Sequence, residues 1–157
     1  MDRAPVLDGS LQDALWQQAA VTDQFFQREP FEKQPATERT EVRVLYDRHN
    51  LYFGIHCFES NPRRITGTEL RRDTDPTVDD NFAILISPTH DQRSGYTFTV
   101  NPLGTQFDAL LTDEGRQIDP FWDGVWKSSA KVGPDGWTAT IAIPFSRSEE
   151  HTSELQS

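Results

Sequence analysis

Short segments in which apolar and polar residues alternate recur along the chain, and this two-residue period constrains the fold more than any other feature. Residues 126–132 and 137–143 are the clearest pair, because Gly133-Pro134-Asp135-Gly136 separates them with residue types typical of a tight turn. Successive side chains of a β-strand point to opposite faces of the sheet, so the period places one apolar set on one face. The two segments are therefore predicted to form an antiparallel hairpin.

The same period continues through the middle of the sequence. Residues 42–47 and 51–58 are predicted to form a second hairpin. Residues 82–86, 96–100 and 107–111 follow the same pattern. Several short strands with little helix favour an all-β fold with two sheets packed face to face. The side chains expected between the sheets are Val44, Phe53, Ile55, Phe82, Ile84, Phe98, Trp126, Trp137 and Ile141.

The N-terminal region has the only helix signal. Residues 6–7 are predicted to form a short strand, followed by one or two helical turns with Ser10 as the N-cap. Trp16 in this region is expected to be a core residue. Weaker strand signals fall at 21–27 and 65–70.

Length and charge restrict the function further. A chain of 157 residues is expected to form one domain. Its formal charge of -10 repels phosphate backbones and anionic headgroups, so neither nucleic acid nor a membrane surface is an expected partner. No apolar run approaches the roughly 20 residues of a membrane span, and no signal peptide is recognisable. Direct membrane insertion is not expected.

The last residues differ in character from the rest. Residues 147–157 resemble the in-frame translation of a common short-read sequencing adapter over their whole length. We therefore expect a domain at residues 1–146, truncated at its C-terminal end, and a non-native tail at 147–157. The natural protein is expected to continue past Ser146.

Three of the four tryptophans lie close together and suggest a ligand surface. A sugar ring stacks on a flat aromatic face, and nearby carboxylates bind its hydroxyl groups. Trp122 lies in a predicted loop beside Asp119 and Asp123, which makes these three the candidate saccharide-binding residues. The alternative is that Trp122 packs on its own loop. Trp126 and Trp137 share their strand faces with aliphatic residues and are expected in the core.

An acidic segment is a candidate calcium site, because calcium prefers six to eight oxygen ligands. Its carboxylates are Asp73, Asp75, Asp79 and Asp80. The spacing is not that of an EF-hand, and a solvated acidic loop balanced by Arg71 and Arg72 is the alternative. A weaker second cluster consists of Asp113, Glu114 and Asp119.

No catalytic motif is recognisable. The chain has no zinc-hydrolase histidine spacing, no Gly-x-Ser-x-Gly motif and no glycine-rich phosphate loop, so it is not expected to be an enzyme or to bind a nucleotide. Haem would need two of His49, His56 and His90 as ligands, because Met1 is the only methionine, and haem is not expected. Cys57, the single cysteine, is expected to be an inert core thiol.

Motifs spread over residues 6–146 occur in a characteristic order. They are Leu7-Asp8-Gly9 with Trp16, Leu51-Tyr52-Phe53-Gly54-Ile55, Gly95-Tyr96 with Val100-Asn101-Pro102-Leu103-Gly104, Trp122-Asp123-Gly124-Val125-Trp126, and Gly136-Trp137 with Ile143-Pro144-Phe145. Together they resemble the family 9 carbohydrate-binding-module-like domain, in the version found at the N-terminus of large bacterial secreted or outer-membrane proteins of uncharacterised function. The resemblance implies a jelly-roll-like β-sandwich whose closing strands lie beyond this fragment.

The resemblance also implies a function. Family members bind sugars between tryptophans and carry structural calcium. The chain is accordingly expected to be a non-catalytic domain that binds an oligo- or polysaccharide, within a larger bacterial protein linked to polysaccharide degradation. That protein would be periplasmic, outer-membrane-associated or secreted, with the remainder of the parent chain as a partner and glycoside hydrolase activity in the parent left open. The alternatives are a structural accessory domain of an outer-membrane protein and, less favoured, a haem- or ligand-carrying sandwich.

Overall fold

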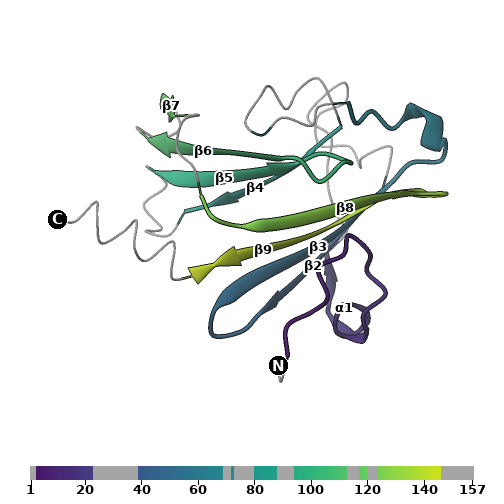
Figure 1. Ribbon diagram of the computed structural model, residues 1–157, viewed down its shortest axis with the longest axis horizontal. Coiled ribbons are helices and arrows are strands. Elements are labelled where there is room, and N and C mark those ends of the chain that lie inside the picture. The colour runs from purple at the N-terminus through teal and green to yellow at the C-terminus, as the bar shows by residue number, and fades with distance from the viewer. Residues whose placement is uncertain are drawn as a thin grey trace.

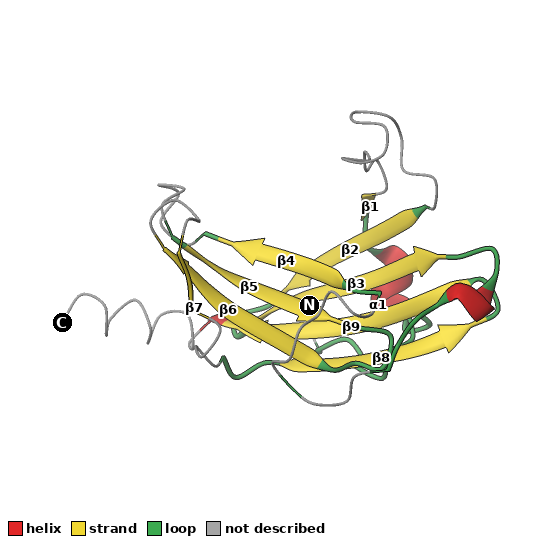
Figure 2. Cartoon of the chain, turned by 90° about the horizontal axis from the view of Figure 1, so that it is seen from above, coloured by secondary structure: helices red, strands yellow, loops and turns green. Residues whose placement is uncertain are grey.

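Two antiparallel β-sheets face each other in the computed structural model, which describes residues 3–22, 39–68, 72, 80–87, 94–112, 117–119 and 124–145 (Figures 1 and 2). In chain order the elements are α1 (Ala14–Gln18), β1 (Val21–Thr22), β2 (Thr40–Tyr46), β3 (Asn50–Phe58), the 3₁₀ turn η1 (Pro62–Arg64), β4 (Phe82–Ile86), β5 (Gly95–Val100), β6 (Gln106–Thr112), β7 (Gln117–Asp119), β8 (Lys127–Gly133) and β9 (Gly136–Pro144). The predicted all-β sandwich is confirmed. Neither α1 nor η1 is long and apolar enough to cross a membrane.

The larger sheet has the strand order β1-β2-β3-β9-β8. Its two hairpins, β2–β3 and β8–β9, are those that the alternating period predicted. The first joins the second through β3 and β9, which pair from Asn50 opposite Pro144 to Phe58 opposite Gly136. Gly136 has a φ of 142°, and a Cβ atom there would lie 2.1 Å from the carbonyl oxygen of Cys57, so only glycine fits at this turn.

The smaller sheet has the order β4-β5-β6-β7, and its inner face packs on that of the larger sheet. The buried side chains between them are Ile55, Ile84, Tyr96, Phe98, Val100, Trp126, Trp137, Ala139, Ile141 and Ile143. Most of the predicted inward-facing residues are in this set, and Phe53 and Phe82 pack against it while only partly buried. The inward faces of β3, β4, β5 and β9 were therefore predicted correctly, whereas in β6 the alternating apolar residues 107, 109 and 111 are on the outer face.

Val44 is the exception among the predicted core residues. It lies opposite Phe53 and so has the expected parity, yet 47% of its surface is exposed. β2 is next to the edge strand β1, and the facing sheet has one strand fewer than the sheet that holds Val44. A side chain on the inner face is therefore not necessarily buried when it lies near the edge of the wider sheet.

The N-terminal segment covers the outer face of the larger sheet with a second apolar cluster. Trp16 is fully buried there and packs with Leu11, Tyr52 and Ala142. Gly54 on β3 lies directly beneath the indole ring, because a Cβ atom at this position would come within 2.8 Å of Trp16 Cε3. The prediction of Trp16 as a core residue is confirmed, although it belongs to this outer cluster rather than to the core between the sheets.

The helix in this segment begins later than predicted. Asp13, not Ser10, is the N-cap of α1, and its carboxylate accepts a hydrogen bond from the Leu15 amide. Ser10 instead donates its amide and hydroxyl to Asp8, which makes a local turn. The strand predicted at residues 6–7 is absent. Of the strand predicted at 65–70, residues 65–68 form no strand and 69–70 lie outside the described ranges. The strand predicted at 21–27 is confirmed only for β1, because 23–27 also lie outside those ranges.

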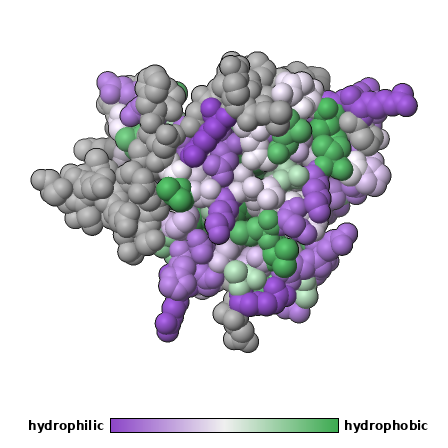
Figure 3. All heavy atoms as spheres, in the orientation of Figure 1, coloured by the Kyte–Doolittle hydropathy of each residue, from purple (hydrophilic) through white to green (hydrophobic). Residues whose placement is uncertain are grey.

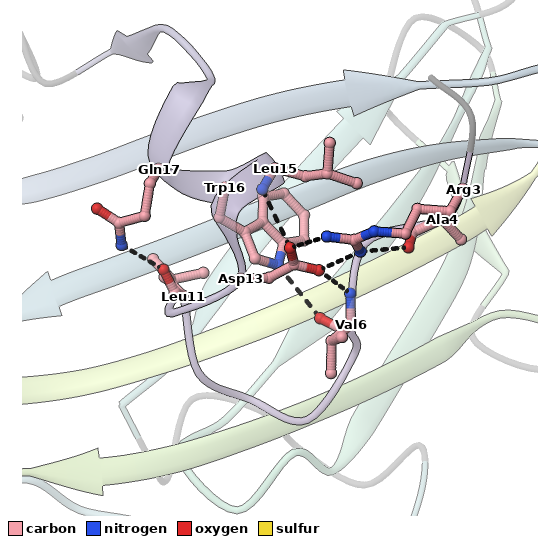
Figure 4. A network of polar contacts seen from close by, with 8 residues as sticks. All are labelled: Arg3, Ala4, Val6, Leu11, Asp13, Leu15, Trp16 and Gln17. Atoms are coloured by element: carbon pink, nitrogen blue, oxygen red, sulfur yellow. Dashed lines mark hydrogen bonds and ion pairs between the residues drawn. The ribbon is translucent and has the colours of Figure 1, made fainter.

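Figure 4 shows how Asp13 holds the N-terminal segment together. Its side chain is 3% exposed and accepts two hydrogen bonds from the Arg3 guanidinium, at 2.6 and 2.8 Å, and one from the Val6 amide at 2.7 Å. Trp16 Nε1 donates to the Val6 carbonyl at 3.2 Å. The Arg3 guanidinium above all, with the Val6 and Leu15 amides, holds the pKa of Asp13 well below its usual range. The carboxylate thus fixes the chain before the helix against the helix itself.

A second attachment lies at Gly9. Its amide donates to Thr140 Oγ1 at 3.0 Å, and its carbonyl accepts from the Thr138 hydroxyl. Gly9 has a φ of 88°, and a Cβ atom there would lie 2.9 Å from the backbone of Ala130. The N-terminal segment is therefore attached to β9 and lies against β8.

Candidate functional site

A buried carboxylate joins three distant parts of the chain on the side of the sandwich between β6 and β8. The side chain of Asp108 is fully buried. Its Oδ2 atom accepts hydrogen bonds from Arg72 Nη2 at 2.8 Å, from the Gly124 amide at 3.0 Å and from Trp126 Nε1 at 2.9 Å. We call Arg72, Asp108, Gly124 and Trp126 the Asp108 cluster. Burial of a carboxylate is costly unless it is paired and hydrogen-bonded, and these donors offset that cost.

The pairing of β5 with β6 explains why Asp108 points inward. Asp108 lies directly opposite Phe98, whose ring is in the core, so both side chains are on the inner face. β7 pairs only with residues 110–112, so it stops short of Asp108. Residues 124–126, just before β8, lie beside this part of β6, because Gly124 and Trp126 both donate to the carboxylate.

Arg72 completes the cluster from the acidic segment. Nη2 donates to the Gly124 carbonyl at 2.7 Å as well as to Asp108, while 43% of the arginine side-chain surface stays exposed. Gly124 is therefore held at both its amide and its carbonyl group. The sequence interpretation gave Arg72 only the role of balancing acidic neighbours and overlooked Asp108. An aspartate in the middle of a predicted strand was the available signal, but the sequence did not reveal which face it occupies.

The tryptophans predicted to be structural are confirmed as such. Trp126 is 6% exposed and packs edge to face on Phe98, with ring centroids 5.3 Å apart. Gln106 donates to the Trp126 carbonyl at 2.9 Å, which fixes its backbone as well. Trp137 is 3% exposed within the same core. Neither ring has an open face for stacking on a ligand.

The predicted saccharide-binding residues are only partly covered by the structure. Asp119 is an exposed residue of β7 and lies opposite Leu110, which packs against the core. Its parity therefore directs it to the inner side of the sheet edge. Trp122 and Asp123 lie outside the described residues, so their role stays a prediction.

Only one of the four predicted calcium ligands lies in the described part of the chain, so the calcium site stays a prediction. Asp80 is exposed, and its Oδ2 atom accepts a hydrogen bond from the Thr66 amide at 2.8 Å. The other three carboxylates of that segment, Asp73, Asp75 and Asp79, lie outside the described residues, as do Asp113 and Glu114. Over the ranges that the structure covers, no three His, Cys, Asp or Glu residues are grouped to hold a metal ion.

The histidines that the structure describes do not suit a haem. His49 precedes β3 and His56 lies near its other end, about 20 Å away at the usual rise per strand residue. Two axial ligands must reach one iron, so this pair does not supply them. His56 instead stacks on Phe58, with ring centroids 3.7 Å apart. His90 lies outside the described residues.

Cys57 packs at the margin of the core between the sheets. Burial raises the pKa of its thiol to about 12. Because the thiolate is the reactive form, this agrees with the predicted inert thiol.

One face of the molecule is shown in Figure 3. Hydrophobic residues gather there in small separate patches, with hydrophilic residues between them. Such scattered apolar side chains are ordinary for a surface in water and do not by themselves indicate a docking site.

Comparisons with known proteins place the fold. No family model matches the chain, and a search of curated proteins found no match. A solved structure of a candidate carbohydrate-binding protein from Bacteroides uniformis is similar, with a TM-score of 0.65 at 12% identity, over 85% of this chain and 63% of that one.

Two structures of a family 9 carbohydrate-binding module from Caldicellulosiruptor kristjanssonii are also similar. The complex with glucose has a TM-score of 0.61 at 13% identity, and the complex with cellotriose has 0.62 at 15% identity; each match covers 92% of this chain. At such identities the likeness shows the fold, and the β-sandwich implied by the sequence resemblance is confirmed. The chain spans 63–66% of the length of these three structures.

Proposed function

We propose that this chain is a non-catalytic domain that binds an oligo- or polysaccharide. The observation that carries the proposal is the likeness of its sandwich to modules that were solved with glucose and with cellotriose. Fold likeness alone does not fix a function, so the proposal depends on the residues of the site. Trp122 would stack on the sugar, and Asp119 or Asp123 would accept hydrogen bonds from its hydroxyl groups.

The Asp108 cluster supports this assignment of Trp122. Gly124 follows Trp122 by two residues, and its backbone is held on both sides by Asp108 and Arg72. An anchored loop loses less conformational freedom when a ligand binds, which favours affinity. The anchoring therefore suits a ligand-binding loop.

The test is a calorimetric titration of the parent protein and Trp122→Ala with glucose and cellotriose. We expect weak binding by the parent and an affinity at least about tenfold lower in the variant, because stacking on one ring contributes about 1 kcal/mol beyond its buried area. The matched control is Val125→Ala, which removes a side chain that is 64% exposed in the same connection. Equal affinities of the parent and Trp122→Ala across a panel of oligosaccharides would remove Trp122 from the site.

The proposal also includes the parent protein, its cellular location and a bound calcium ion. We place it in a larger extracytoplasmic bacterial protein linked to polysaccharide degradation, with calcium bound by the acidic segment that contains Asp80. Thermal unfolding with added calcium and with EDTA tests the ion, because a structural calcium would raise the unfolding temperature of the metal-loaded form. Fractionation of cells that express the full-length parent tests its location. If no saccharide binds, a structural accessory domain of the parent becomes the better hypothesis.

A further inference from the structure

One buried nitrogen of His56 has no hydrogen-bond partner within the described part of the chain. The atom is Nε2, on the ring of a β3 residue. A buried polar atom without a partner is unfavourable, and such an atom in a folded protein calls for an explanation. Asp135 Oδ1 lies 3.4 Å from Nε2, within reach of an ion pair if the ring is protonated, but the two atoms lack the geometry of a hydrogen bond. The contact is therefore incomplete while the ring is neutral.

The surroundings of the ring favour its protonated form. His56 lies on the outer face of the larger sheet, because its neighbours in sequence pack against the core between the sheets. Glu41 on β2 is directly opposite His56, a position at which opposite charges attract across two strands. Phe58 stacks on the ring with centroids 3.7 Å apart, and an aromatic face attracts a cation. With Asp135, three groups would therefore bind an imidazolium more strongly than a neutral imidazole.

Two guanidinium groups near His56 are paired with Glu41. Arg39 lies 2.6 Å and Arg43 3.5 Å from its carboxylate oxygens. Arg39 is also above the Phe58 ring, 5.6 Å from its centroid, and Arg43 is diagonal to His56 across the β2–β3 pair. The two arginines oppose a further positive charge, while Glu41 and Asp135 balance them.

The strands on the other side of His56 add little charge next to the ring. Thr138 of β9 lies opposite His56, and its hydroxyl donates to the Gly9 carbonyl. Lys131 of β8 is one strand further away and pairs with Asp8 at 4.0 Å. Asp135 is therefore the charged group that contacts the ring.

Asp135 connects the turn between β8 and β9 to the end of β3. Its carbonyl accepts a hydrogen bond from the Glu59 amide at 2.9 Å, while the Glu59 carboxylate accepts one from the Asn61 amide. The Asp135 side chain is 63% exposed, so it is able to turn toward His56. A hydrogen bond from a protonated His56 ring would give this turn a second tie to β3.

We propose that His56 and Asp135 form a latch that closes when His56 takes up a proton from the solvent. Histidine is the side chain whose charge ordinarily changes between about pH 5 and 8. In the closed latch the Nε2 proton is donated to the Asp135 carboxylate, which pairs the buried nitrogen and fixes the β8–β9 turn on β3. The latch stabilises the turn at acid pH and loses this effect as the pH rises and the ring gives up its proton. It does not depend on the proposed saccharide binding.

The experiment measures amide hydrogen exchange of the full chain at about pH 5.5 and about pH 7.5, on either side of the usual histidine range and corrected for the intrinsic effect of pH on exchange. The reporter is the Glu59 amide, which is bonded to the Asp135 carbonyl. We expect its protection to be about threefold greater at the lower pH, because an ion pair with one exposed partner is weak. The variants are His56→Gln and Asp135→Asn, and neither should show this difference. His49→Gln is the matched control, because it removes an exposed histidine between β2 and β3, and it should behave as the parent does.

Asp135→Asn separates the charge from the hydrogen bond. It keeps an oxygen that accepts from Nε2 but removes the carboxylate, so a turn that is merely better packed at low pH would keep its pH dependence in this variant. Equal pH dependence of Glu59 protection in the parent and in Asp135→Asn would therefore overturn the latch. The His56 ring resonances of the parent give a second measurement if a variant fails to fold. They should shift between about pH 7.5 and 5.5 together with the Asp135 carboxyl resonance, and a His56 ring that does not titrate in this range would also overturn the latch.

Discussion

A single added methyl group at Gly54 tests the packing of the N-terminal segment on the larger sheet. Alanine is normally the better residue in a strand interior, where glycine is destabilising by roughly 0.5–1 kcal/mol. At Gly54, however, the new Cβ atom would lie 2.8 Å from Leu11 Cδ2 and from Trp16 Cε3. Carbon atoms in contact prefer about 3.5–4.0 Å, so one partner must move by close to 1 Å.

The neighbours decide the size of the effect. Leu11 is able to rotate its terminal methyl group away, but the Trp16 ring is fully buried and its Nε1 is bonded to the Val6 carbonyl. Overpacking of such sites costs about 1–3 kcal/mol, which exceeds the intrinsic gain from alanine. We expect Gly54→Ala to lose about 1–2 kcal/mol, and at this chain length each kcal/mol lowers the unfolding temperature by about 2–4 °C.

The assay is chemical and thermal unfolding of Gly54→Ala beside Gly133→Ala. Gly133 is the matched control, because a Cβ atom there would meet nothing closer than 3.9 Å, and its change should stay within about 0.5 kcal/mol. In a Trp16→Leu background the loss of stability caused by Gly54→Ala should be smaller, because the ring that the new methyl group contacts is absent. A Gly54→Ala protein as stable as the parent, or more stable, would refute the packing of Trp16 on β3.

Three further outcomes are expected. Folding lowers the pKa of Asp13, so this carboxylate adds stability above its unfolded pKa of about 4 and loses that contribution as the pH falls. The unfolding temperature of the parent should therefore decrease below about pH 5, and that of Asp13→Asn should decrease less. Thermal unfolding at a series of pH values measures this difference. The thiol of Cys57, whose pKa is raised to about 12, should react with an aromatic disulfide reagent at pH 8 only after denaturation, which absorbance records. Trp137→Ala should lose about 3–5 kcal/mol in urea unfolding, while the folded fraction keeps its saccharide affinity.

The strands were predictable because their signal is local. Both hairpins of the larger sheet and the apolar faces of β4, β5 and β9 follow from a period of two that each segment contains on its own. A slip by one residue would expose every apolar side chain of a face, so the sequence specifies the register strongly. Which strands pair across distant segments, such as β3 with β9, is not written in any one segment.

The side chains whose burial the sequence did not predict depend on neighbours that lie far away in the sequence. Val44 has the right parity but is near the edge of the wider sheet. Aspartate is usually a surface residue, and the burial of Asp108 depends on Arg72 and on the residues just before β8. Phe107 points to the outer face by alternation and is nevertheless 4% exposed. Parity predicts the direction of a side chain, whereas burial depends on what covers that direction.

The tryptophans narrow the saccharide hypothesis to a single residue. Trp16, Trp126 and Trp137 are at most 6% exposed, and the first two donate their Nε1 protons to Val6 and Asp108 within the protein. Exposing any of these rings to a ligand would open a packed cluster, and for the first two it would also break an internal hydrogen bond. Of the four tryptophans in the sequence, Trp122 is the one that such packing does not remove from consideration. Saccharide binding through a tryptophan therefore depends on Trp122. Replacing it by alanine tests that dependence, and titration of the parent protein decides between a binding domain and a structural one.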